Sequence, residues 1–202
     1  MPEVSVDPSR FRLTDEQKAV ITAKPDSRRL VLAGPGTGKT EVLARRLVHL
    51  LGAGLRPSQM LVLSFSRNAV RNVSERVRHL SDVDDVTHLE LRHLVVRTFD
   101  SWSFRALRQS GESAEDLLAG SYEGNIAKLV GKLRGSQRDE IRERLKHVRH
   151  IIVDELQDLA GWRGEMVVEL LRLLCPAGEG PAGFTLLGDP AQAIYGFSLK
   201  LN

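Results

Sequence analysis

The chain has 202 residues, of which 42% are hydrophobic, which suits one domain with a sizeable core and excludes two full catalytic domains. Lys and Arg number 29 against 26 Asp and Glu, so the net charge of +3 gives little evidence of a polyanionic partner. A single cysteine, Cys175, excludes a disulfide framework, and the absence of a signal-like start or a long apolar run leads us to expect a cytoplasmic protein without membrane contact.

The first predicted elements lie on either side of a glycine-rich loop. Residues 14–17, Thr-Asp-Glu-Gln, have the form of a helix-capping box and predict a short helix over 15–23, with Gln17 in its first turn. The apolar run that follows predicts a strand over 29–33. Beyond the loop, apolar residues at helical spacing predict a helix that ends at Gly52.

The loop itself, residues 33–40 with the sequence Ala-Gly-Pro-Gly-Thr-Gly-Lys-Thr, is typical of a site that binds the phosphates of a nucleoside triphosphate. Glycines let consecutive backbone N–H groups turn toward one anion, and the following helix adds its dipole. Lys39 is expected to reach the β- and γ-phosphates, and Thr40 to place its hydroxyl on Mg²⁺. Because the loop begins with Ala33 where the strict pattern has Gly, a surface turn with a solvated lysine is the alternative. The predicted nucleotide-binding residues of this loop are Gly34, Pro35, Gly36, Thr37, Gly38, Lys39 and Thr40.

The alternation of strand and helix then continues. Residues 60–63 predict a second strand, 67–80 a second helix and 94–98 a third strand. Asp100 is the predicted N-cap of a helix that runs through Arg108.

Strand signals disappear between residues 110 and 147, where helix-forming and charged residues dominate. We interpret this segment as a small helical insertion. Its basic side chains could contact a phosphate backbone. Because Glu140 and Glu143 are interleaved with them, a solvated helix face with intrahelical ion pairs is the alternative. The basic residues are Lys128, Lys132, Arg134, Arg138, Arg142, Arg144, Lys146 and Arg149.

Strands return at residues 150–153 and 183–187, with a helix predicted over 163–175 between them. The first of these strands ends in Asp154 and Glu155, at the edge where open α/β sheets place their ligands. Asp154 is the expected Mg²⁺ ligand, and Glu155 suits a group that orients or deprotonates an attacking water. A helix cap with a first-turn charge is the alternative for this pair. The strand and helix order favours a parallel sheet that helices cover on both faces.

Six segments, taken in order, resemble the motifs of superfamily 1 DNA helicases of the UvrD/Rep/PcrA branch. They are similar to its Q motif, motif I, motif Ia, the segment after Ia, motif II and motif III, and the Gln-Asp pair after Asp-Glu in motif II separates this branch from other helicases. The segments are residues 13–17, 33–40, 62–69, 97–102, 153–158 and 187–197. The resemblance implies a RecA-like P-loop NTPase domain formed by residues 1–109 and 148–202, with the helical insertion at 110–147.

The resemblance implies ATP as the nucleotide and Mg²⁺ as its metal. Gln17 is similar to the glutamine that reads the adenine edge, a role that suits an amide with both a donor and an acceptor. Gln157 and Gln192 resemble the pair that links the γ-phosphate and the attacking water to the DNA site. With Lys39 and Glu155, they complete the implied catalytic set.

The same resemblance implies a contact surface for single-stranded DNA. Phe65, Tyr195 and Phe197 look like aromatic residues that contact or stack on bases, and Arg67 lies beside the first of them. For Phe65 and Tyr195, a place in the hydrophobic core is the alternative.

The chain also departs from the family pattern. Asp100 stands where the family has a histidine, and Ser198 where it has an arginine that touches the γ-phosphate. The second RecA-like domain of the family, with its arginine fingers, is not part of this sequence. We therefore expect a partner domain in cis or in trans, and ATP binding with at most trace hydrolysis by these residues alone.

The function that these motifs imply is the ATP-binding first domain of a 3′-to-5′ DNA helicase, in which hydrolysis drives translocation along single-stranded DNA. A degenerate ATP- or DNA-binding module without turnover and a partner subunit of a split helicase are the alternatives. A different P-loop NTPase, whose insertion serves protein contacts, is a further alternative.

Overall fold

A parallel β-sheet organises the chain in a computed structural model that describes residues 12–81, 94–178, 180, 182–189 and 191. Its strands are β1 (Arg28–Leu32), β2 (Met60–Ser64), β3 (Val96–Thr98), β4 (His150–Val153) and β5 (Gly183–Gly188). The strand order is β1-β5-β4-β2-β3, and every neighbouring pair is parallel. Because parallel strands end at a common edge, the loops after all of these strands gather on one side of the sheet.

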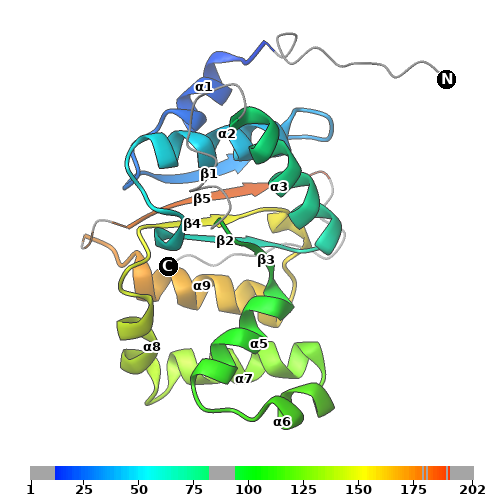
Figure 1. Cartoon of the computed structure of the whole chain (residues 1–202), viewed down its shortest axis with the longest axis vertical. Coiled ribbons are helices and arrows are strands. Elements are labelled where there is room, and N and C mark those ends of the chain that lie inside the picture. The colour runs from blue at the N-terminus through cyan, green and yellow to red at the C-terminus, as the bar shows by residue number, and fades with distance from the viewer. Residues whose placement is uncertain (1–11, 82–93, 179, 181, 190, 192–202) are drawn as a thin grey trace, which may run out of the picture.

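Helices cover both faces of the sheet, as the sequence predicts (Figure 1). One layer contains α1 (Asp15–Ile21), α2 (Lys39–Gly52) and α3 (Arg67–Ser81). The other contains α5 (Phe99–Gln109), α6 (Ala114–Ala119), α7 (Tyr122–Arg134), α8 (Arg138–Leu145) and α9 (Trp162–Leu174). Two short 3₁₀ helices, η2 (Pro57–Gln59) and η3 (Leu156–Asp158), lie next to β2 and β4.

The two faces of the sheet carry separate hydrophobic clusters. Leu61, Leu63 and Ile151 pack against the α5, α7 and α9 layer, whereas Val62 and Ile152 pack against α2 and α3. Every residue of β2 and β4 is buried, which explains why these strands are continuous apolar runs instead of alternating ones.

The N-terminus of α5 corrects one sequence prediction. Thr98, not Asp100, is the N-cap, because its Oγ1 accepts the Ser101 N–H at 3.2 Å. Asp100 lies in the first turn and forms an ion pair with Arg163 of α9 at 2.8 Å. The third strand is also shorter than predicted and begins at Val96.

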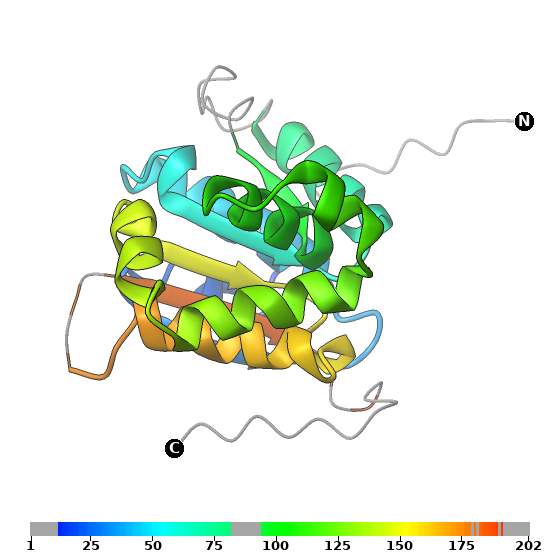
Figure 2. The ribbon, with the colours of Figure 1, turned by 90° about the horizontal axis from the view of Figure 1, so that it is seen from below.

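Residues 110–147 contain the helices α6, α7 and α8, and α7 runs beside α9 and α5 (Figure 2). Lys128 and Lys132 both pair with Glu112, and Arg134 pairs with Glu165 and Glu169. These pairs favour the interpretation of the basic cluster as ion-paired. They differ from the expected intrahelical pairs, because each joins residues that are distant in the sequence. The division of the chain at residues 110 and 147 stays a prediction.

A buried arginine fixes the loop between α1 and β1. The Arg46 guanidinium of α2 is fully buried and donates to the carbonyls of Ile21 and Lys24, at 3.0 and 2.9 Å, and to that of Ala23. Burial, with a smaller effect of the Arg29 charge, lowers the pKa of Arg46 to about 10, so the group keeps its charge at neutral pH. These bonds satisfy the carbonyls at the C-terminus of α1 and attach that helix to α2.

His150 of β4 holds the same loop from the other side. Its Nδ1 lies 2.6 Å from the Pro25 carbonyl oxygen, which can only accept, so Nδ1 carries the proton. Nε2 lies 2.9 Å from the Thr185 hydroxyl and accepts from it in the neutral ring. Burial is the main cause that lowers the pKa of His150 to about 4.

The buried imidazole predicts a pH-dependent contribution to stability. Between pH 6.5 and 4 the unfolded chain binds a proton at this position and the folded chain does not. The contribution of the neutral imidazole to the free energy of unfolding is therefore complete above pH 6.5 and falls by about 3 kcal/mol as the pH decreases to 4. The stability lost in His150→Gln should therefore be larger at pH 7.5 than at pH 4.5 in urea unfolding experiments. An equal loss at both pH values would contradict this assignment.

Candidate functional site

The loop after β1 forms a cradle around the Lys39 side chain. Gly36 and Gly38 have φ angles of 72° and 80°, in the left-handed region that favours glycine. The Thr37 hydroxyl donates to the Gly34 carbonyl at 2.7 Å and tightens the turn. The Lys39 Nζ donates to the carbonyls of Ala33 and Gly34 at 3.1 Å each, so its charge lies against the start of the loop.

Gln17 of α1 connects its helix to this loop. Its Nε2 donates to the Thr37 carbonyl at 2.8 Å, and its Oε1 accepts the Thr14 N–H at 2.8 Å within the predicted capping box. Each end of the amide keeps one further hydrogen-bonding position, because Nε2 has a second hydrogen and Oε1 a second lone pair. A pocket of about 390 Å³ lies here between α1, β1 and the loop, and its apolar walls include Val20, Val31, Val42 and Leu187. Such a pocket suits a flat ring with a polar edge.

The two acids after β4 occupy different environments. Asp154 is 3% exposed, and burial, with the neighbouring Glu155 charge as the second cause, raises its pKa to about 6. Its Oδ1 accepts the Glu155 N–H at 3.0 Å. Glu155 is half-buried and has a φ of 55°, the only positive value of a non-glycine residue within the described part of the chain. This conformation costs about 1 to 2 kcal/mol for a residue with a Cβ, and such strain gathers at functional sites.

A chain of side-chain contacts joins the ends of β1, β4 and β5. The Gln157 Nε2 donates to Glu155 at 2.5 Å, and its Oε1 accepts the Asp189 N–H at 2.8 Å. The Oδ2 of Asp189, which is fully buried and has no hydrogen-bond donor among the described residues, lies 3.5 Å from the Lys39 Nζ. The structure thus links the glycine-rich loop, the acid pair and the end of β5. Gln192, the other predicted glutamine, lies outside the described residues.

Asp189 was absent from the residues that sequence reasoning selected, although its position gives a signal. It follows an apolar strand directly, as Asp154 does, and parallel strands bring such positions to one edge. Gly188 before it has no room for a side chain, because a Cβ there would lie 2.9 Å from the Leu156 Cβ. This close approach lets η3 bring Gln157 onto the end of β5.

The backbone of Glu155 can be tested separately from its carboxylate. Glu155→Gly and Glu155→Ala both remove the carboxylate, but only the alanine variant keeps a Cβ in the left-handed region. We expect the glycine variant to be more stable than the alanine variant by about 1 kcal/mol. Urea unfolding measures the difference, and a more stable alanine variant would exclude backbone strain at this position.

An aromatic side chain lies at the same edge of the sheet. Phe65 follows β2 and is 41% exposed, which excludes a place in the core. The Arg163 guanidinium lies 5.6 Å from the centre of its ring and pairs with Asp100. Arg67 is exposed at the start of α3. Arg163 was not predicted from the sequence, because it lies at the start of α9, 98 residues after Phe65, and no local pattern there indicates a contact with that ring. Tyr195 and Phe197 lie outside the described residues.

The parallel sheet, the lysine-bearing loop between β1 and α2, and the buried aspartate after β4 define an α/β domain of the P-loop class. Residues 13–130 and 126–199 match the family model of the UvrD/REP helicase N-terminal domain. The chain belongs to this family, which confirms the resemblance inferred from the motifs.

Relatives of this chain are named as DNA helicases. It is 34% identical over 113 residues to a putative ATP-dependent DNA helicase, YjcD, of Bacillus subtilis, a match that covers 55% of this chain and 14% of the relative. It is 37% identical over 84 residues to DNA helicase IV of Escherichia coli, covering 41% and 11% of the two chains. For ATP-dependent DNA helicase UvrD1 of Mycobacterium tuberculosis the identity is 30% over 144 residues, covering 65% and 18%.

These matches span a small part of each relative's length. Among solved structures, the Pif1 helicase of Candida albicans aligns with 89% of this chain and 33% of its own, at 16% identity and a TM-score of 0.46. No helix within the described ranges of this chain is long and apolar enough to cross a membrane.

Proposed function

We propose that the chain is the ATP-binding first domain of a 3′-to-5′ DNA helicase, in which ATP hydrolysis drives movement along single-stranded DNA. The observation that carries this proposal is the contact chain from Lys39 through Asp189 and Gln157 to Glu155. It joins the loop that would hold the phosphates to the carboxylate that would act on water. A second RecA-like domain, in the same or another chain, would complete the site, and a cytoplasmic location remains our expectation.

The residues present fit Mg·ATP. The glycine-rich loop leaves open space at Gly34 and Gly36, where an added Cβ would meet no other atom within 4 Å. The Lys39 ammonium already faces the loop, and the pocket beside Gln17 offers apolar walls with an amide at its edge. Thr40 and Asp154 would hold Mg²⁺, which would neutralise phosphate charge when bound.

Within this site the chain's own groups have distinct tasks. Lys39 would exchange its contacts with the loop carbonyls for phosphate oxygens. Glu155 would orient or deprotonate the attacking water, and its bond to Gln157 holds the carboxylate in one orientation. Because Gln157 also binds the Asp189 N–H, a shift of either loop would change the position of that carboxylate.

The surface around Phe65 would receive single-stranded DNA. Phe65 and Arg67 lie at the carboxyl edge of the sheet, beside the acid pair, and combine an exposed ring with an exposed cation. Arg163 adds a second guanidinium over the same ring. Aromatic stacking with cationic neighbours binds bases without sequence preference.

A comparison of two exposed aromatics tests this assignment. Phe65→Ala should weaken binding of a dT20 oligonucleotide by about 5- to 100-fold, because one stacked base contributes ~1 to 3 kcal/mol. Tyr122→Ala, which removes a ring 67% exposed on α7, is the matched control and should leave the affinity unchanged. Fluorescence anisotropy at several salt concentrations measures both. Equal losses of affinity in the two variants would mean that Phe65 does not form a DNA-binding surface at this edge of the sheet.

A further inference from the structure

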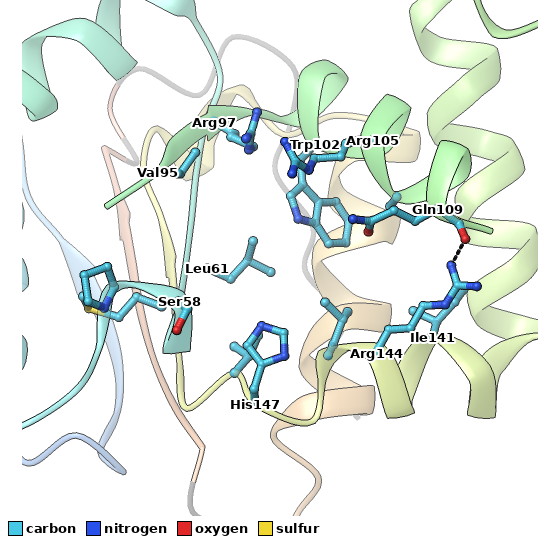
Figure 3. A pocket seen from close by; sticks show the side chains of 15 residues that line it. Ser58, Leu61, Val95, Arg97, Trp102, Arg105, Gln109, Ile141, Arg144 and His147 are labelled. Atoms are coloured by element: carbon cyan, nitrogen blue, oxygen red, sulfur yellow. Dashed lines mark hydrogen bonds between the residues drawn. The ribbon is translucent and has the colours of Figure 1, made fainter. Parts of the chain in front are cut away.

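A cavity of about 690 Å³ opens on the opposite side of the molecule from the glycine-rich loop, between the sheet, α5 and α8 (Figure 3). It is bordered by Met60, the first residue of β2, and by Val148, just before β4. These are the amino ends of strands whose carboxyl ends carry the proposed ATP and DNA sites. Nothing in the proposed function uses this cavity.

The interior of the cavity is apolar. Leu61 of β2, Trp102 of α5, Ile141 of α8 and Val148 are each at most 8% exposed and line it. Figure 3 shows Leu61 in the centre, with the Trp102 ring on one side and Ile141 beyond it. The space suits a bulky aliphatic or aromatic side chain, which would bury its surface there without leaving polar atoms unpaired.

The rim of the cavity is basic. Arg97 of β3 and Arg105 of α5 lie together beside Trp102, and neither has a hydrogen bond or ion pair among the described residues. Burial and, second, the like charge of Arg105 lower the pKa of Arg97, which agrees with two guanidinium groups facing the same space. No carboxylate is among the described side chains that line the cavity.

Arg97 and Arg105 differ from four other basic residues of this layer, which have partners within the described part of the chain. Arg144, on the same rim, donates to the Gln109 carbonyl and pairs with Glu140 at 2.6 Å, so it closes the wall between α5 and α8. Lys128, Lys132 and Arg134 are likewise paired with carboxylates. Two cations held close together, with no carboxylate partner in the part of the chain that the structure describes, favour a ligand that brings its own negative charges.

We propose that this cavity binds an acidic peptide segment of a partner protein, with a bulky apolar side chain in the pocket and carboxylates on Arg97 and Arg105. The inference goes beyond the proposed helicase function and does not rest on it. Charge complementarity selects an acidic ligand, and the aliphatic interior selects an apolar side chain. A nucleobase in the same space would leave its hydrogen-bonding edge facing Leu61, Ile141 and Val148, which makes nucleic acid the poorer fit.

Trp102 provides a reporter for this site. The chain has two tryptophans, so Trp162→Phe leaves Trp102 as the only one. The probe is a synthetic peptide of four aspartates followed by leucine and phenylalanine, with an amidated C-terminus. Titration of the Trp162→Phe chain with this peptide should change the Trp102 emission in a saturable way. A peptide in which two alanines replace the leucine and phenylalanine should bind at least about tenfold more weakly.

Charge reversal at two positions on neighbouring helices distinguishes binding in the cavity from nonspecific electrostatic attraction of the peptide. Arg105→Glu should weaken the peptide at least about tenfold, whereas Arg142→Glu makes the same charge change on an exposed residue of α8 outside the cavity and should weaken it by less than twofold. Both positions are exposed, so both variants should fold, and circular dichroism checks this. Equal effects of the two variants would overturn the proposal.

A nucleic acid competitor provides the second decisive arm. A dT20 oligonucleotide should not displace the peptide, because Phe65 and Arg67, which form the proposed DNA surface, are not among the residues that line the cavity. Displacement that disappears in Arg105→Glu would mean that the cavity binds nucleic acid, and the proposal would be wrong. Peptide binding that persists in Lys39→Ala would show that the site works independently of the nucleotide site.

Discussion

Replacing Lys39 with alanine should lower the affinity for Mg·ATP by about 10- to 150-fold, because charged hydrogen bonds of this kind contribute ~1.5 to 3 kcal/mol. Lys39 is the cation that the described loop presents, and its Nζ lies against the Ala33 and Gly34 carbonyls. Isothermal titration calorimetry with Mg·ATP measures the change. Lys146→Ala, which removes an exposed lysine at the C-cap of α8, is the matched control and should bind as the wild type does.

The Lys39 variant also changes a buried charge balance. In the wild type the Lys39 Nζ lies 3.5 Å from the fully buried Asp189 carboxylate, so alanine leaves that carboxylate without its nearby cation. We expect a loss of about 3 kcal/mol in the free energy of unfolding. A double variant, Lys39→Ala with Asp189→Asn, should recover most of this stability but none of the affinity. If the double variant also recovered ATP binding, Lys39 would act through folding alone.

Replacing Arg46 with methionine should destabilise the protein by about 3 to 5 kcal/mol, since its removal leaves a group of buried carbonyls without a donor. Those carbonyls, of Ile21, Ala23 and Lys24, lie at and just beyond the C-terminus of α1. Arg71→Met makes the same change on α3 at a side chain that is 68% exposed. This control should cost less than about 0.5 kcal/mol. Urea unfolding compares the two, and similar losses would mean that the buried bonds contribute little.

Local patterns were sufficient to predict the sheet and the position of its glycine-rich loop. The apolar runs around residues 30, 61 and 151 are long, and the loop at 33–40 has a strict spacing, so neighbours in sequence determine them. The acid pair at 154–155 could be placed because parallel strands end at a common edge. These features depend on few contacts between distant residues.

The features that sequence reasoning missed depend on such contacts. The pairing of Asp189 with Lys39 requires β5 to lie between β1 and β4, and this strand order is not visible in any one segment. Arg46 interrupts the apolar face of α2, and a charged residue in such a position predicts exposure to solvent. Its hydrogen-bond acceptors are instead carbonyls at the end of α1 and in the loop after it. Asp100 was the predicted cap, but its carboxylate pairs with Arg163 from the distant helix α9, and Thr98 accepts the Ser101 N–H in its place.

The way in which α1 is attached also bears on how the protein responds to heat. Within this helix only Ile21 is buried, so its apolar contact is small, and the Arg46 bonds also hold its C-terminal end. Such an element can open while the rest of the sheet remains folded, in the manner of a separate cooperative unit seen by hydrogen exchange. In the proposed function, Gln17 of α1 contacts the base and the glycine-rich loop holds the phosphates, so warming should weaken discrimination between bases before it weakens phosphate binding.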